Sequence, residues 1–248
     1  MDSDQIKVKW RGEIVSVQPR STVWRYLNDN RTHREIGFNL FLKGEAACGN
    51  EMVMLPGSDS DAYDFCVAIS GKQMQKIRAH IGDELEGTGW TKKYPETEFA
   101  DYYRAGSLKI RKTAPSGEVF AINSSVPLYD GTPVPRVNSA DYPGPPWKLE
   151  APPLEVYAWR GARMLSKAAW KGKCFQCIWA NMANVTVQYD FDRNIVHNRF
   201  ETFCYGPLSC RYYSMGPARA VPYKGVSGVK DQGWLDEICV ESRKSRDE

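Results

Sequence analysis

The segment 171–219 carries two cysteine clusters, Cys174-Phe175-Gln176-Cys177 and Cys204-Tyr205-Gly206-Pro207-Leu208-Ser209-Cys210. Between them, residues 184–191 and 195–203 alternate in polarity and are rich in β-forming side chains, and residues 192–194 (DRN) separate the two runs as a turn. The segment therefore predicts one β-hairpin with a pair of thiols at each end of its open side. Such a hairpin brings four sulfurs within reach of one tetrahedral ion, which is the geometry that zinc requires.

The spacing of the cysteines predicts a structural site. Intervals of 2, 26 and 5 residues separate them, and four thiolates would leave no open coordination position for a substrate. A CxxC pair also occurs in thioredoxin-like redox sites, where a hydrophobic strand comes before the pair, whereas residues 171–173 (KGK) come before this one. A redox pair or incidental thiols are the alternatives. The predicted ligands of a structural Zn²⁺ ion are Cys174, Cys177, Cys204 and Cys210.

The composition of the 248-residue chain is that of an ordinary soluble protein. No run approaches the roughly 18 apolar residues of a membrane helix, and the N-terminus lacks the basic and then apolar order of a secretion signal, so we expect a cytoplasmic protein with no membrane partner. In that reducing compartment, cysteine pairs more often bind metal than form disulfides. The net charge is only +3, but residues 156–224 hold 10 Lys or Arg against 3 Asp or Glu, which places the basic surface around the cysteines.

The N-terminal part, residues 1–126, predicts a small barrel. Alternation predicts strands at residues 6–17, 37–43, 63–69 and 84–91, with a fifth at 108–112 or 118–122. A helix is expected at residues 71–80, with Ser70 as its N-cap. Three strands, a helix and two further strands form the element order of an OB-fold barrel.

Two predicted loops of this barrel, residues 18–36 and 92–104, would flank the ligand groove of an OB fold. Both interleave cations with aromatic rings, a combination that neutralises phosphates and stacks exposed bases. The alternative is that the rings pack beneath a long loop whose cations are solvated. Together with basic residues around the cysteines, the predicted nucleic-acid contacts are Arg20, Trp24, Arg25, Tyr26, Arg31, Arg34, Lys92, Lys93, Tyr94, Arg104, Lys171, Lys173, Arg193, Arg199, Arg211 and Arg219.

Residues 127–153 carry eight prolines and are the predicted linker between the barrel and a C-terminal domain at 154–248. Proline is excluded from the interiors of helices and sheets, so this stretch is expected to run extended. Beyond it, residues 154–159 (LEVYAW) predict a short strand, residues 160–170 a helix or turn, and residues 233–240 a short closing element. The fold class expected for the whole chain is mainly β with minor α.

Signatures of catalysis are not found. The chain lacks the GxxxxGK, GxSxG, HExxH and GxGxxG motifs, and three histidines leave little for acid–base chemistry near neutral pH. Asp59, Asp61 and Asp64 could hold a divalent cation in a nuclease, but their Gly- and Ser-rich surroundings favour a solvated loop. We therefore expect that the protein is not an enzyme.

The cysteine hairpin resembles a zinc ribbon, and a barrel followed by a ribbon is similar to many OB-fold and zinc-ribbon nucleic-acid-binding proteins of translation, transcription and replication. The chain also resembles a family of uncharacterised bacterial proteins whose ribbon is similar to residues 200–207 (FETFCYGP), a likeness that implies no activity. Zinc ribbons usually carry a tight CxxC at both knuckles, whereas five residues separate Cys204 from Cys210. The resemblance implies a nucleic-acid-binding protein. Because aromatic platforms suit unstacked bases, we expect a non-catalytic protein that binds RNA or single-stranded nucleic acid, alone or within a ribonucleoprotein or protein complex. The alternative is a scaffold or accessory subunit whose OB and zinc-ribbon modules bind another protein.

Overall fold

The computed structural model describes residues 5–25, 31–48, 51–52, 62–114, 151–190, 195–206, 210 and 212–216. These residues are mainly β, as predicted, and their strands form one continuous sheet. The strands are β1 (Lys7–Arg25), β2 (Arg31–Cys48), β3 (Glu51–Met52), β4 (Phe65–Ile69), β5 (Glu84–Thr91), β6 (Tyr102–Lys112), β7 (Arg163–Met164), β8 (Ala180–Asp190) and β9 (Ile195–Cys204). The helices are α1 (Gly71–Ile77), α2 (Leu154–Arg160) and α3 (Lys167–Lys171). None of these helices is long and apolar enough to cross a membrane.

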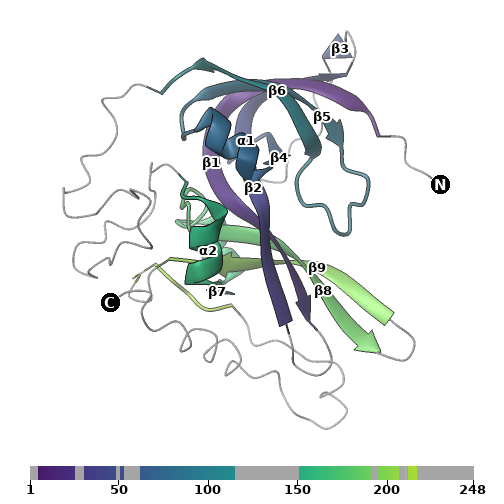
Figure 1. Cartoon of the computed structure of the whole chain (residues 1–248), viewed down its shortest axis with the longest axis vertical. Coiled ribbons are helices and arrows are strands. Elements are labelled where there is room, and N and C mark those ends of the chain that lie inside the picture. Colours follow the sequence, from purple (N-terminus) through teal and green to yellow (C-terminus); the bar gives the residue numbers. More distant parts are fainter. Residues whose placement is uncertain are drawn as a thin grey trace.

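Five strands close into a ring in the order β1-β2-β4-β6-β5 and back to β1 (Figure 1). Neighbours in the ring are antiparallel except β4 and β6, which run parallel, and α1 lies in the chain between β4 and β5. The ring is filled by apolar side chains from alternate strand positions, among them Ile14, Leu40, Val67 and Leu85, all fully buried. It is therefore a barrel-like unit, and the same core includes Ala151, Tyr157 and Tyr205 from the C-terminal part of the chain.

β1 belongs to both halves of the sheet. Its residues 7–13 pair with β5 inside the ring, and its residues 22–25 pair in parallel with β8, from Thr22 opposite Asn184 to Arg25 opposite Val187. β8 in turn pairs with β9, and β9 with β7. The parts of β1 and β2 that leave the ring, residues 20–25 and 31–37, run down beside β8 and β9 (Figure 1). This two-stranded extension is called the ribbon below, and it is a different segment from the cysteine hairpin that resembles a zinc ribbon.

A second core joins the outer face of the ring to the segment that carries the first cysteine pair. Phe41 points away from the ring core, and its ring centroid lies 5.1 Å from that of Phe175 and 6.2 Å from that of Trp170. Gln18 accepts a hydrogen bond from Trp170 Nε1 at 3.0 Å and donates one to the carbonyl of Phe175 at 2.6 Å. All four side chains are buried, so these contacts fix the cysteine segment to the barrel.

The prediction of a loop at residues 18–36 is wrong, because β1 continues to Arg25 and β2 begins at Arg31. Ser21 and Val23 on one face of the extension are buried while Trp24 on the other is exposed, and strands with one solvated face alternate polar with apolar residues. The charges within this alternation made a strand resemble a loop. Only residues 26–30 separate the two strands, and they lie outside the described residues.

The prediction of a strand at residues 154–159 is also wrong, because residues Leu154–Arg160 form α2. Short apolar runs do not distinguish a strand from one turn of buried helix. Here Val156, Tyr157 and Arg160 are buried, which is the spacing of one helical face, and Pro153 precedes the first turn. The segment at 160–170, predicted as helix or turn, contains β7 and the start of α3.

Other predicted elements are confirmed. β5 spans residues 84–91 as expected, and α1 begins after Ser70, whose side chain accepts a hydrogen bond from the amide of Gln73 in a capping box. The hairpin is formed by β8 and β9, and the fifth strand of the ring, β6, includes residues 108–112. Residues 118–122, 127–150 and 233–240, and Asp59 and Asp61, lie outside the described residues, and the domain boundaries stay predictions.

Candidate zinc site and nucleic-acid surface

The four predicted zinc ligands lie around the open end of the β8–β9 hairpin. Cys174 and Cys177 occupy the turns between α3 and β8, and Cys204 ends β9 opposite Ala180, the first residue of β8. Burial, followed by smaller effects of Cys204 and Cys210, raises the pKa of the Cys174 thiol to about 12. Burial and the same neighbouring cysteines also raise the pKa of Cys177. Cys204 and Cys210 therefore lie close enough to the first cysteine pair to disfavour ionisation of Cys174 and Cys177.

Backbone amides point at three of the four sulfurs. Gly206 N donates to Cys204 Sγ at 3.3 Å. Backbone hydrogen bonds to Cys177 and Cys210 lower the pKa of those two thiols, although burial, which raises it, is the larger effect in both. Hydrogen bonds from amides stabilise the charged thiolate, which is the form that binds metal. In each case a donor lies two residues after its cysteine: Trp179 for Cys177, Gly206 for Cys204 and Tyr212 for Cys210.

Two buried arginines lie beside the thiols. Arg163 lowers the pKa of Cys210, a smaller effect than burial, and its guanidinium lies 3.7 Å from the ring centroid of Tyr213. Arg160 Nε donates to the carbonyl oxygen of Tyr205 at 2.6 Å, and Tyr205 directly follows Cys204 in the chain. The positive charge of Arg163 offsets part of the negative charge that several thiolates would bring into a buried site.

Within the described residues, no group of three or more His, Cys, Asp or Glu side chains is already arranged to hold a metal ion. A zinc site therefore stays a prediction. The donor chemistry fits zinc, because four thiols with amide donors and nearby cations are the set that a Cys₄ site uses.

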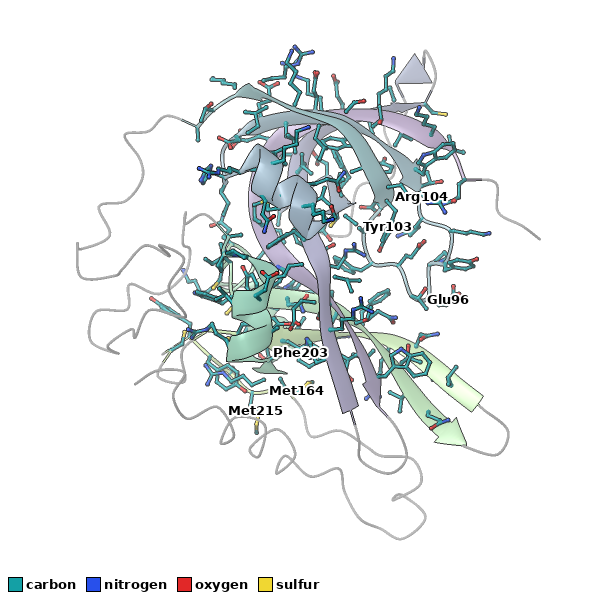
Figure 2. The ribbon with its side chains drawn as sticks, in the orientation of Figure 1. Glu96, Tyr103, Arg104, Met164, Phe203 and Met215 are labelled. Carbon is teal, nitrogen blue, oxygen red and sulfur yellow. The ribbon has the colours of Figure 1, made fainter. Side chains whose placement is uncertain are left out.

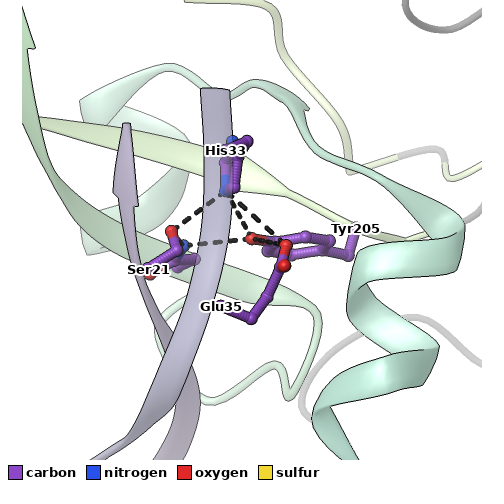
Figure 3. A network of polar contacts seen from close by, with 5 residues as sticks. Ser21, His33, Glu35 and Tyr205 are labelled. Atoms are coloured by element: carbon purple, nitrogen blue, oxygen red, sulfur yellow. Dashed lines mark hydrogen bonds and ion pairs between the residues drawn. The ribbon is translucent and has the colours of Figure 1, made fainter. Parts of the chain in front are cut away.

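A network of polar side chains joins the ribbon to Tyr205, the residue after Cys204 (Figure 3). His33 Nε2 lies 2.7 Å from the Tyr205 hydroxyl oxygen and 3.0 Å from Ser21 Oγ. The Tyr205 hydroxyl donates to Glu35 Oε1 at 3.1 Å, and Asn181 donates to Ser21. The sequence alone does not reveal this network, because its members come together only through the pairing of β1 with β8.

The geometry of this network does not suit nucleophilic catalysis. A serine–histidine–carboxylate relay places the serine and the carboxylate on opposite nitrogens of the imidazole. Here Ser21 Oγ and Glu35 Oε1 both face His33 Nε2, at 3.0 and 3.8 Å. Since Tyr205 gives its one hydroxyl proton to Glu35, the short contact requires His33 Nε2–H to donate to the Tyr205 oxygen. We interpret the network as a structural junction between the ribbon and the cysteine hairpin.

Replacing Tyr205 with Phe is expected to lower the free energy of unfolding by about 1–3 kcal/mol, because buried partners of the lost hydroxyl stay unsatisfied. Urea unfolding followed by far-UV circular dichroism measures the change. Tyr94→Phe, at a half-exposed ring, is the matched control and is expected to change stability by less than about 0.5 kcal/mol. Equal stability of the two variants would show that the junction contributes nothing.

Trp24 and Arg34, two of the predicted nucleic-acid contacts, are exposed on one face of the ribbon. Arg34 pairs with Thr22, two residues before Trp24, so the two side chains share that face. Trp24 pairs with Thr186 of β8, and Thr186 with Asn198 of β9. The indole, 41% exposed, therefore lies beside two polar residues, Thr186 of β8 and Asn198 of β9, on the neighbouring strands.

The loop between β5 and β6, residues 92–101, carries a second group of these contacts. Lys93 Nζ lies 5.3 Å from the ring centroid of Tyr94, which is 50% exposed, and Lys92 Nζ lies 3.4 Å from Asp101 Oδ1. The predicted loop ran to residue 104, but β6 already begins at Tyr102. Figure 2 shows Arg104 near the start of β6, above the loop that carries Glu96.

The remaining predicted contacts lie near the cysteine segment or are not described. Lys171 and Lys173 are exposed around the end of α3, whereas Arg199 Nε lies 2.7 Å from Glu201 Oε1 and is already paired. The structure does not describe the side chains of Arg25 and Arg31, nor Tyr26, Arg193, Arg211 and Arg219.

The chain was compared with protein-family models, curated proteins and solved structures, and none of them matches it.

Proposed function

We propose that the protein binds nucleic acid without catalysis, with RNA or another single strand as its preferred ligand and a structural zinc ion in its C-terminal part. The strand order of the ring supports an OB fold, because β1-β2-β4-β6-β5 closes on β1. In chain order, α1 lies between β4 and β5, which are the third and fourth strands of the ring along the sequence. OB folds bind oligonucleotides through the loops after their first and fourth strands. In this chain those positions are taken by the ribbon and the loop 92–101.

The observation that carries the proposal is a large exposed ring next to a cation at both positions. Trp24 shares its face with exposed Arg34 on the ribbon, and exposed Tyr94 lies beside Lys93 on the loop. Exposed aromatic rings stack unpaired bases, and the neighbouring cations neutralise phosphates. No described helix has the length and basic face of a major-groove reader, which favours single strands over duplex DNA.

Zinc would be held by Cys174, Cys177, Cys204 and Cys210. When bound, it supplies a crosslink between the turns before β8 and the end of β9. The chain's own amides orient three of the sulfurs, and Arg163 balances charge beside Cys210. Since β8 pairs with β1, fixing the hairpin also fixes the strand that presents Trp24.

Replacing Trp24 with Leu is expected to weaken binding of a fluorescein-labelled oligouridine by about 5- to 150-fold, because one stacked base contributes about 1–3 kcal/mol. Fluorescence anisotropy of the zinc-loaded protein measures the affinity. Trp24→Phe keeps a stacking ring and is expected to retain most of it, while Ile6→Ala removes an exposed apolar side chain on the barrel and should have no effect.

A salt titration of the wild type tests the proposal as a whole. Each phosphate neutralised in a single strand contributes a slope of about 0.7 in a plot of log affinity against log salt. A flat salt response, or an affinity unchanged by zinc chelation, would contradict the proposal. Protein purified without nuclease that carries a protein partner and no nucleic acid would favour a scaffold instead.

A further inference from the structure

Arg20 is a partly buried cation whose guanidinium has no hydrogen-bond or ion-pair partner among the described residues. Its Nε is fully buried and makes no hydrogen bond, and its guanidinium carbon lies 5.6 Å from the ring centroid of Tyr103. Tyr103 lies at the start of β6, where the loop 92–101 ends (Figure 2). Burial is the main cause that lowers the pKa of Arg20. The positive charge is therefore held partly desolvated against a ring. The carboxylate of Glu98, which accepts from the amides of Lys93 and Tyr94, acts on it electrostatically but forms no ion pair with it.

A second polar group without a partner lies next to Arg20 on the same face of the sheet. Arg20 pairs with Gly37 of β2, and the next pair on this face joins Gln18 to Asn39. Asn39 is fully buried, and in the described part of the chain neither Nδ2 nor Oδ1 makes a hydrogen bond. Gly37 leaves the space that the guanidinium uses, because a Cβ there would lie 3.2 Å from Arg20 Nη2.

Neither group is explained by a structural role. Buried polar groups in native proteins nearly always have hydrogen-bond partners, and a desolvated cation without one costs stability. Gln18, the neighbour of both groups, is fully satisfied by Trp170 and Phe175. A guanidinium and an amide N–H that share one face and have donors to spare are the groups that proteins use to bind an oxyanion.

We infer that Arg20 and Asn39 bind one phosphate group on the outer face of the ring, where the loop 92–101 meets β6. This inference rests on the proposed function, in which the phosphate belongs to the bound strand. Free inorganic phosphate offers the same chemistry. Arg20 and Trp24 lie on the same side of β1, about 13 Å apart along the strand. One short single strand can therefore place a phosphate on the guanidinium and a base on the indole.

Arg20→Met tests the site, because it keeps an apolar stem over Tyr103 and removes the charge. If Arg20 had a structural role, Arg20→Met would be less stable than the wild type. A phosphate site predicts a variant that is as stable as the wild type or more so, because a partly desolvated cation has been removed. The same variant is expected to bind oligouridine about 10- to 100-fold more weakly, since hydrogen bonds to charged groups have that effect, and its salt slope should fall by about 0.7.

Thermal unfolding of the full-length, zinc-loaded protein in sodium phosphate, compared with sodium chloride of the same ionic strength, identifies the source of the anion. Lys109→Met, which removes an exposed cation on β6, is the matched control and is expected to change binding no more than about twofold. Asn39→Leu is a second variant, which keeps the number and branching of the side-chain heavy atoms and removes the amide, and it should weaken binding in the same direction as Arg20→Met.

The outcomes separate this inference from the proposed function. Weaker oligouridine binding by Arg20→Met and Asn39→Leu, with no effect of free phosphate, supports a site for the phosphates of the strand. Phosphate that raises the melting temperature of the wild type but not of Arg20→Met, when no oligonucleotide binds, supports the site and overturns the proposed function. If both variants bind oligouridine and phosphate as the wild type does while Trp24→Leu is impaired, the inference is overturned and the proposed function stands.

Discussion

Replacing Cys204 with Ser is expected to abolish zinc binding and to lower the thermal unfolding midpoint by about 10 °C or more. Structural zinc contributes several kcal/mol to folding, and each kcal/mol corresponds to about 2–4 °C in a chain of this size. Cys204 is the informative position because it ends β9 and its sulfur accepts the amide of Gly206. Zinc content by elemental analysis and the midpoint by circular dichroism give the two readouts.

Cys48→Ser is the matched control, because Cys48 lies at the end of β2, away from the cysteine hairpin. This variant is expected to keep one zinc ion per chain and the melting temperature of the wild type. Chelation of wild-type zinc should reproduce the midpoint of Cys204→Ser and should not lower that variant further. A Cys204→Ser protein that retains the zinc of the wild type would contradict the predicted ligand set.

Replacing Gly44 with Ala is expected to lower the free energy of unfolding by about 3 kcal/mol or more. Gly44 faces Gly12 where β1 and β2 pass each other in the ring. A Cβ on Gly44 would lie 2.2 Å from the Arg11 carbonyl oxygen and 2.5 Å from the Gly12 Cα. Both are backbone atoms, so the clash can be relieved only by separating paired strands, which places the variant at the severe end of overpacking.

Gly106→Ala, in β6 of the same ring, is the control for Gly44→Ala. A Cβ at Gly106 would lie 3.3 Å from Thr88 Oγ1, and this hydroxyl can rotate away. The control is expected to cost less than about 1 kcal/mol. Urea unfolding measures the free energy of unfolding of both variants. Equal decreases would mean that the backbone at the crossing of β1 and β2 adjusts more easily than the distances indicate.

The elements that the sequence predicted well are those that local forces determine. β5 has one buried residue at every second position, so its alternation marked both of its ends. α1 begins where a Ser70 side chain and Gln73 cap one another, and this signal needs only four residues of sequence. The β8–β9 hairpin likewise combines two alternating runs with a turn between them.

The elements that the sequence did not reveal depend on distant partners. The ribbon is extended because Val23 is buried beside Val185 of β8, and no local pattern announces that neighbour. The junction of His33 and Tyr205 needs the same pairing. The unpartnered state of Arg20 could not be predicted either, because an arginine between Pro19 and Ser21 resembles any solvated arginine until the packing of Tyr103 against it is known.

The parallel pairing of β1 with β8 has a consequence for the order in which the chain folds. Residues 22–25 of β1 leave the ribosome early, but their partners at residues 184–187 are made only after most of the chain has been synthesised. Until then, one side of this segment has unpaired amides and carbonyls, and such strand edges recruit other chains. Pairing between segments so far apart in the sequence is also slow, because the long loop between them must first be closed at a cost in chain entropy. Cotranslational folding can therefore complete the ring first, while the β1 edge needs protection from aggregation until the cysteine hairpin arrives.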